Sequence, residues 1–151
     1  MKEFEHNFFV DTNIFLRLVS TENKTQHQEC LELLTKITNP NLQNNSNFYT
    51  GNIVLAETIW TLQSYYQNTK QQSIDIISAI LSIKNLTIKD DYAIKTALII
   101  FENFNVKFAD ALIASIPAIT KKEWIVISYD KDFDKIGVIR KEPSDVVKLL
   151  K

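Results

Sequence analysis

The sequence has a single cysteine and no long apolar segment. Because Cys30 is the only thiol, no disulfide can form within the chain, and a reducing compartment suits the protein. No run of apolar residues reaches the roughly 18 to 20 that would span a bilayer. Residues 1–7 are mostly polar or charged and lack the basic start and apolar core of a secretion signal. We therefore expect a cytoplasmic protein with no membrane contact.

An excess of positive charge is also absent. The chain has 17 lysine and arginine residues against 18 aspartate and glutamate residues, which gives a net charge of −1 and a pI of about 6.1. Domains that bind nucleic acid through a broad basic surface usually have a pI above about 9. The charge balance therefore argues against such a surface, although it is compatible with smaller basic patches.

Nitrogen and sulfur ligands for a metal ion are equally scarce. Only His6, His27 and Cys30 could supply them, and these residues lack the paired spacing of a zinc finger. The sequence therefore disfavours a zinc site.

Short apolar runs alternate with stretches of helical period along the chain. A length of 151 residues and a hydrophobic content of 45% fit one domain, spanning residues 1–151, with a core of its own. The apolar runs that predict strands are residues 8–10, 48–50, 86–88, 124–128 and 138–139. The stretches that predict helices are residues 14–19, 25–37, 53–66, 73–81, 90–101, 108–116 and 144–150. The alternation predicts a three-layer α/β/α sandwich with a mainly parallel sheet of four to five strands.

Polar residues mark the expected starts of two helices and one loop. Ser73 is the expected N-cap of the helix at 73–81, and Asp90 is expected to open the next helix. The segment 39–47 is rich in asparagine and contains Pro40, which indicates an exposed loop.

Four acidic residues occupy positions that a ligand site would use. Asp11 and Asp130 each directly follow a predicted strand, and the carboxyl ends of parallel strands meet at the edge where such sheets bind ligands. Asp110 lies in the first turn of a predicted helix. Glu57 lies in a largely apolar helix, where an unpaired carboxylate would be costly to bury. Taken singly, helix capping explains Asp11 or Asp110 about as well as catalysis does.

Taken together, the acids point to a bound cation. Several partly buried carboxylates raise one another's pKa unless positive charge lies among them. Mg²⁺ and Mn²⁺ favour oxygen ligands of this type.

Four segments carry the acids in order along nearly the whole chain. They are Phe9–Leu16 (FVDTNIFL), Val54–Glu57 (VLAE), Phe108–Ala114 (FADALIA) and Ser128–Asp134 (SYDKDFD). These segments resemble the motifs of the PIN domain family, and within it the VapC-type toxins of toxin–antitoxin pairs. No single segment is specific, but all four in order at these spacings are much more so.

The resemblance implies a Mg²⁺- or Mn²⁺-dependent ribonuclease that hydrolyses RNA phosphodiester bonds. The catalytic residues that it implies are Asp11, Glu57, Asp110 and Asp130. The metal ligands are drawn from Asp11, Asp110, Asp130 and Asp132. The sequence leaves open whether Asp130 or Asp132 is the fourth acid, and whether one ion binds or two.

Further implications concern supporting residues and partners. Asn13 and Ser128 are expected to orient a carboxylate or a water molecule at the metal. An antitoxin protein is the expected partner, and a homodimer the expected assembly. The alternative is a non-catalytic PIN-like module that binds RNA or a protein, but the presence of all four acids favours the nuclease.

Overall fold

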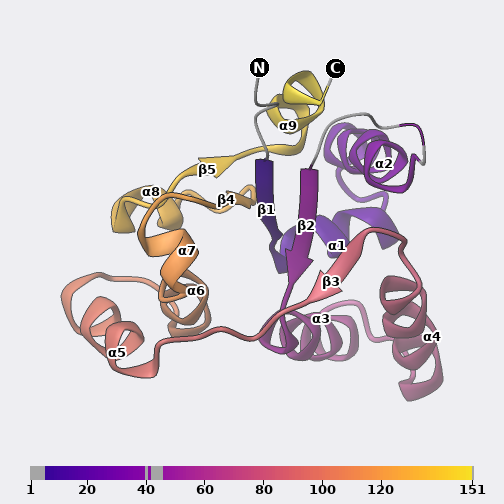
Figure 1. Cartoon of the computed structure of the whole chain (residues 1–151). Helices are drawn as coiled ribbons and strands as arrows, with labels where there is room; N and C mark the ends of the chain where they lie inside the picture. Colours follow the sequence, from indigo (N-terminus) through magenta and orange to yellow (C-terminus); the bar gives the residue numbers. More distant parts are fainter. Residues whose placement is uncertain (1–5, 40, 42–45, 151) are drawn as a thin grey trace.

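The centre of the protein is a parallel β-sheet. A computed structural model describes residues 6–39, 41 and 46–150. Within these residues the strands are β1 (His6–Val10), β2 (Ser46–Thr50), β3 (Leu86–Ile88), β4 (Ile125–Ile127) and β5 (Arg140–Lys141). They form a five-stranded sheet in the order β3-β2-β1-β4-β5, and every neighbouring pair is parallel (Figure 1). The predicted parallel sheet is confirmed.

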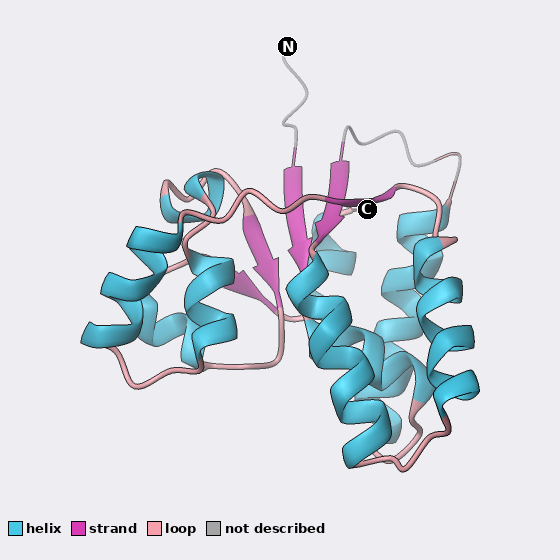
Figure 2. Ribbon diagram, turned by 90° about the horizontal axis from the view of Figure 1, so that it is seen from below, coloured by secondary structure: helices cyan, strands magenta, loops and turns pink. Residues whose placement is uncertain are grey.

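Helices cover both faces of this sheet. They are α1 (Thr12–Val19), α2 (Lys24–Thr38), α3 (Asn52–Ser64), α4 (Lys70–Leu81), α5 (Ile94–Asn103), α6 (Phe108–Ala114), α7 (Pro117–Thr120), α8 (Asp132–Ile136) and α9 (Pro143–Leu149). In Figure 1, α5 to α8 lie on one side and α1, α2 and α4 on the other, and Figure 2 shows the sheet between the two groups. The three-layer sandwich is therefore confirmed. No helix in the described part of the chain is long and apolar enough to cross a membrane.

The strands are apolar on both faces because helices cover both. Phe8, Phe9 and Val10 of β1 are at most 1% exposed, and Val126 and Ile127 of β4 are fully buried. Strands of a covered parallel sheet characteristically read as continuous apolar runs. This is why the two central strands are visible as unbroken runs in the sequence.

The carboxyl ends of β1 and β4 meet at the point where the strand order reverses. From β1 the chain proceeds outward through β2 to β3, and it then crosses back to place β4 on the other side of β1. The backbone N–H of Asp11 donates a hydrogen bond to the Ile127 carbonyl at 3.1 Å. Open parallel sheets bind ligands at such a reversal. The topology thus brings the segment after β1 beside the segment after β4.

Several predicted boundaries are wrong, each for a physical reason. Helix α4 begins at Lys70, because Thr69 forms a capping box with Gln72, and Ser73 lies inside the helix. The predicted helix at 108–116 divides in two, since Pro117 has no N–H to continue α6 and instead starts α7. The edge strand is Arg140–Lys141 instead of 138–139. In the predicted loop at 39–47, residues 40 and 42–45 lie outside the described residues, and β2 already begins at Ser46.

Asp90 does not open the helix that follows it, because α5 begins only at Ile94. Its carboxylate instead accepts hydrogen bonds from the backbone N–H of Asn52 at 2.8 Å and from the Asn52 side chain at 2.6 Å. The Tyr92 hydroxyl donates to the same carboxylate at 2.8 Å. A carboxylate at this position satisfies a free N–H of α3 and complements its dipole. Asp90 therefore caps α3, the helix that carries Glu57, from a distant segment.

Gly51 leaves room for the close approach of the Tyr92 side chain. A Cβ atom at this position would collide with the Tyr92 hydroxyl. The backbone itself is extended, with φ of −141°, a conformation that any residue adopts. The need for glycine at this position is therefore purely steric.

We expect Gly51→Ala to lower the free energy of unfolding by about 1–3 kcal/mol, the usual cost of overpacking. Urea denaturation measures this loss. The matched comparison is Gly51→Ala in a Tyr92→Phe background, where the colliding oxygen is gone and the alanine should cost clearly less. Equal losses in the two backgrounds would show that the collision with Tyr92 is not the cause.

Candidate metal centre

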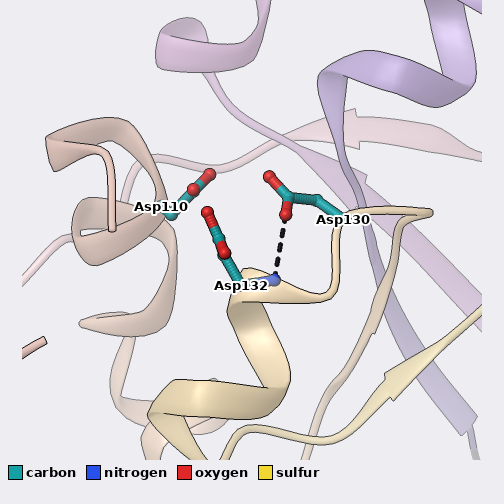
Figure 3. A group of neighbouring side chains, drawn as sticks. All are labelled: Asp110, Asp130 and Asp132. Atoms are coloured by element: carbon teal, nitrogen blue, oxygen red, sulfur yellow. Dashed lines mark hydrogen bonds between the residues drawn. The ribbon is translucent and has the colours of Figure 1, made fainter. Parts of the chain in front are cut away.

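Three aspartates converge beyond the ends of the strands. Asp110 comes from α6, Asp130 from the loop after β4, and Asp132 from the first turn of α8. Each offers a carboxylate oxygen, and the three oxygens lie within 4.8 Å of one another. Figure 3 shows the three side chains pointing toward one another. Carboxylates this close repel one another, and a cation among them removes the repulsion.

Asp110 gives independent support for a cation. Its side chain is only 1% exposed, and its Oδ2 atom is buried without a hydrogen-bond partner among the described residues. Burial raises the pKa of Asp110 to about 7, and the neighbouring Asp11, Asp130 and Glu57 carboxylates raise it too, while Lys107 opposes them. A buried carboxylate oxygen with no donor is costly. A metal ion at this oxygen would offset the cost.

The loop after β4 places both of its acids in the group. The backbone N–H of Asp132 donates to Asp130 Oδ1 at 2.9 Å, which Figure 3 marks with a dashed line. This bond holds the turn through which α8 begins. The Lys135 ammonium lies 2.8 Å from Asp132 Oδ1 and pairs with it. The sequence left a choice between Asp130 and Asp132, and the structure brings both of them to Asp110.

Asp11 lies at the end of β1, is 4% exposed and has its own set of partners. Asp11 Oδ2 accepts hydrogen bonds from Ser128 Oγ at 2.7 Å and from Asn13 Nδ2 at 3.1 Å. Burial raises the pKa of Asp11 to about 6, although the Ser128 hydrogen bond lowers it. Within the described residues, the group of three mutually close ligand oxygens does not include Asp11. The structure thus places Asp11 beside the three aspartates, fixed by hydroxyl and amide donors.

Asn13 and Ser128 link the two strand ends. Asn13 Nδ2 donates to Ser128 Oγ at 2.9 Å, and Asn13 Oδ1 accepts from the Tyr129 N–H at 3.2 Å. Ser128 Oγ also accepts from the Asp130 N–H at 3.0 Å. A single buried hydroxyl therefore contacts both Asp11 and the backbone of Asp130. These contacts are the ones that an orienting role for Asn13 and Ser128 requires.

Glu57 reaches the same region from α3, and it is not unpaired. Glu57 Oε1 accepts a hydrogen bond from Thr12 Oγ1 at 3.0 Å, and Lys107 Nζ lies 3.8 Å from Glu57 Oε2. Burial lowers the pKa of Lys107, but the carboxylates around it more than offset this, so the pKa of Lys107 is raised. The carboxylates concerned are Asp110, Glu57, Asp11 and Asp130.

Sequence reasoning missed Thr12, Lys107 and Arg140. Thr12 follows the first acid directly, and Lys107 precedes Asp110 by three positions, a spacing that places residues on one helix face. These offsets were the available signals. The sequence contains no comparable signal for Arg140, because its partners are brought to it only when β5 pairs with β4.

Arg140 fixes the loop that carries Asp130. Its guanidinium donates two hydrogen bonds of 3.0 Å to the Asp134 carboxylate, and Nη1 donates to the Ser128 carbonyl at 3.1 Å. The hydrogen bonds from Arg140 lower the pKa of Asp134. The arginine side chain is only 12% exposed. A paired arginine fork of this kind is geometrically specific, and it ties α8 to the end of β4.

Comparison with known proteins gives a family and a set of similar structures. The sequence model of the PIN domain family matches residues 8–139. No curated protein matches the chain. Similar solved structures include VapBC2 from Rickettsia felis, bound to a DNA fragment from its promoter, with 22% identity, a TM-score of 0.59, and coverage of 90% of this chain and 98% of that one.

Two further structures show the same likeness. The Mycobacterium tuberculosis toxin VapC20, which cleaves the sarcin–ricin loop, has 19% identity, a TM-score of 0.62, and coverage of 87% of this chain and 96% of that one. A protein from Pyrobaculum aerophilum has 12% identity, a TM-score of 0.60, and coverage of 97% of this chain and 98% of that one. At these identities the likeness establishes the fold.

Proposed function

This chain belongs to the PIN domain family, and we propose that it is a Mg²⁺- or Mn²⁺-dependent ribonuclease, the VapC-type toxin of a toxin–antitoxin pair. One observation carries the proposal: the buried Oδ2 of Asp110, which has no hydrogen-bond partner in the described part of the chain, belongs to a carboxylate grouped with those of Asp130 and Asp132. A helix cap or a surface ion pair would have satisfied that oxygen. A binding site for a divalent cation explains it.

The residues present fit a hard divalent ion. All three donors are carboxylates, and oxygen ligands select Mg²⁺ or Mn²⁺ over softer metals. Asp110, Asp130 and Asp132 would hold the ion. When bound, such an ion would offset negative charge on the phosphodiester and would lower the pKa of water, so that hydroxide is available to attack phosphorus at neutral pH.

The chain's other residues position what surrounds the ion. Asp11 is held by Ser128 and Asn13, so its carboxylate offers a fixed acceptor for a hydrogen bond from the attacking water. Glu57, which accepts a hydrogen bond from Thr12, supplies a second acceptor from α3. In this proposal Asp11 and Glu57 orient water, and no side chain forms a covalent bond to the RNA.

An antitoxin is the proposed partner, and an apolar groove supports it. The groove lies between α1, α2 and α4 and has a volume of about 330 Å³. Apolar side chains make up most of its lining: Phe15, Leu18, Val19, Leu34, Ile76, Ala79, Ile80 and Ile83. A groove of this kind suits the apolar face of a helix. We propose that an antitoxin helix binds there.

A homodimer is the proposed assembly in the cytoplasm. Large apolar side chains are exposed along α5 and just beyond it: Ile94, Leu98, Ile99, Phe101, Phe104 and Phe108. Exposed apolar side chains gathered on one helix and the segment after it commonly mark a protein interface. A second copy of the chain would cover it.

The decisive experiment is incubation of the purified protein with total cellular RNA and Mn²⁺, followed by sequencing of the cleavage ends. We expect discrete new ends that disappear with EDTA and in the Asp110→Asn variant. The control is Asp145→Asn, which removes an exposed aspartate on α9 and should cleave like the wild type. If no RNA is cut, while RNA or protein binding survives in both variants, the chain is a non-catalytic binding module instead.

A further inference from the structure

The carboxylates beyond the strand ends do not all belong to one mutually close group. Asp110, Asp130 and Asp132 form the group in which three oxygens are mutually close. Glu57 lies apart from them on α3 and already has the Lys107 ammonium 3.8 Å from its Oε2. Lys107 is the N-cap residue of α6, and Asp110 lies in the first turn of the same helix. One short segment therefore supplies both an ammonium beside Glu57 and a carboxylate of the aspartate group.

The charge of Lys107 acts on the whole site. It interacts favourably with the carboxylates of Asp110, Glu57, Asp11 and Asp130. The other lysine at the site, Lys135, interacts with Asp132 and Asp130. Both side chains are more than half exposed, at 62% for Lys107 and 54% for Lys135, so each can reorient without unfolding the protein. Of the two, Lys107 is the one that pairs with Glu57 and also interacts with the aspartates.

A second divalent ion would have to bind in the region between the aspartate group and Glu57, where Lys107 lies. In two-metal phosphodiesterases the ions lie about 3.5 to 4 Å apart and share carboxylates. Beside the aspartate group, the acids left for a second ion are Glu57 and Asp11. Asp11 Oδ2 already accepts two hydrogen bonds, and Glu57 has a threonine hydroxyl on one oxygen and an ammonium near the other. An ion there would gain Glu57 and at most one oxygen of Asp11 and would have to displace Lys107, whereas an ion at the aspartate group gains three carboxylates and has Lys135 beside only one of them.

We propose that Lys107 takes the place of a second metal ion beside Glu57, so that the site binds one divalent ion, at Asp110, Asp130 and Asp132. The inference rests on the proposed metal centre and specifies its stoichiometry. A lysine held by its own chain supplies positive charge at any metal concentration. An ammonium in this position can also contact a phosphate oxygen of the RNA, as lysines commonly do.

Counting bound Mn²⁺ tests the inference without any activity measurement. Calorimetry gives the number of ions per chain, and electron paramagnetic resonance detects spin coupling between two neighbouring Mn²⁺ ions. We expect one ion in the wild type. We expect two coupled ions in Lys107→Met, and one again in Lys107→Met combined with Glu57→Gln, which removes the carboxylate that the second ion needs.

Two further variants test whether the number of bound ions depends on the charge of Lys107 and on its position beside Glu57. Lys107→Arg keeps the charge and should bind one ion. Lys135→Met removes the other lysine at the site and should also bind one ion, since Lys135 does not contact Glu57. Two ions in Lys135→Met but one in Lys107→Met would overturn the assignment to Lys107.

The outcomes also distinguish this inference from the function on which it rests. Two ions in the wild type would overturn the role of Lys107 and leave the metal centre intact. A single ion in Lys107→Met would do the same. A wild-type protein that binds no Mn²⁺ would overturn both.

Discussion

Asp110→Asn and Asp130→Asn are each expected to lower the rate of RNA cleavage by at least about a hundredfold. Substitutions that merely disturb the partners of a metal ligand typically cost about 10–100-fold, and these two remove proposed ligands themselves. Asp110 should be the more severe, because it is the buried member of the group and its Oδ2 has no other partner among the described residues. Single-turnover cleavage of an end-labelled RNA measures the rates.

Asp132→Asn should cost less than either, because Lys135 already neutralises part of the Asp132 charge at 2.8 Å. The exposed Asp145 on α9 provides the control, and Asp145→Asn should leave the rate unchanged. An Asp110→Asn variant that cleaves at the rate of Asp145→Asn would remove Asp110 from the site. A loss in Asp132→Asn larger than in Asp130→Asn would reverse the ranking of the two acids.

The second large effect is on stability, and its sign is unusual. Metal-free protein should become less stable as the pH rises from about 4 to 7.5. The pKa of Asp110 is raised from 3.8 to about 7 and that of Asp11 to about 6, chiefly by burial. The folded state therefore holds protons that the unfolded state has released, and by linkage the free energy of unfolding falls across this interval. For Asp110 alone the full effect is roughly 4 kcal/mol.

The pair of Arg140 and Asp134 has the opposite sign, and its effect falls at lower pH. Arg140 lowers the pKa of Asp134, so the stability from that pair is present above the ordinary aspartate pKa and is lost as the pH falls further. Urea denaturation in EDTA at several pH values measures the profile. Asp110→Asn should flatten it and should be more stable than the wild type at pH 7.5.

Metal binding should reverse the loss. Ions that bind only the folded state stabilise it, so Mn²⁺ at pH 7.5 should raise the melting temperature of the wild type. The variant with both Asp11→Asn and Asp110→Asn should show no rise. Equal shifts in the two proteins would count against a metal site that uses Asp110. A wild-type stability that climbs with pH in EDTA would count against the raised pKa values of Asp110 and Asp11.

Much of the site could be anticipated from the sequence because its elements are local patterns. Runs such as residues 8–10 are apolar throughout, which indicates strands buried on both faces. An acid at or just beyond the end of such a run lies near the carboxyl edge of a parallel sheet. Asp11 and Asp130 could therefore be placed at one edge before any side-chain position was known.

The helix boundaries that failed depend on contacts between distant segments. Asp90 is a good helix-starting residue by type, and the local pattern favoured a helix there. Its carboxylate instead reaches Asn52, because β2 and β3 are neighbours in the sheet and bring the two loops together. Local sequence patterns do not show that Asp90 caps α3, a helix far from it in the sequence.

Apolar periodicity and strand ends are properties of short segments, so the sequence was enough to predict the parallel α/β architecture and the shared sheet edge of Asp11 and Asp130. How the acids group there depends on packing between distant segments. The tertiary structure brought both Asp130 and Asp132 to Asp110, since the chain turns after β4 and α8 starts within hydrogen-bond reach of Asp130. The packing of the helices also sets Lys107 beside Glu57, an ion pair between the N-cap of α6 and a residue of α3. Such pairings follow from how helices pack, and that information is spread over the whole chain.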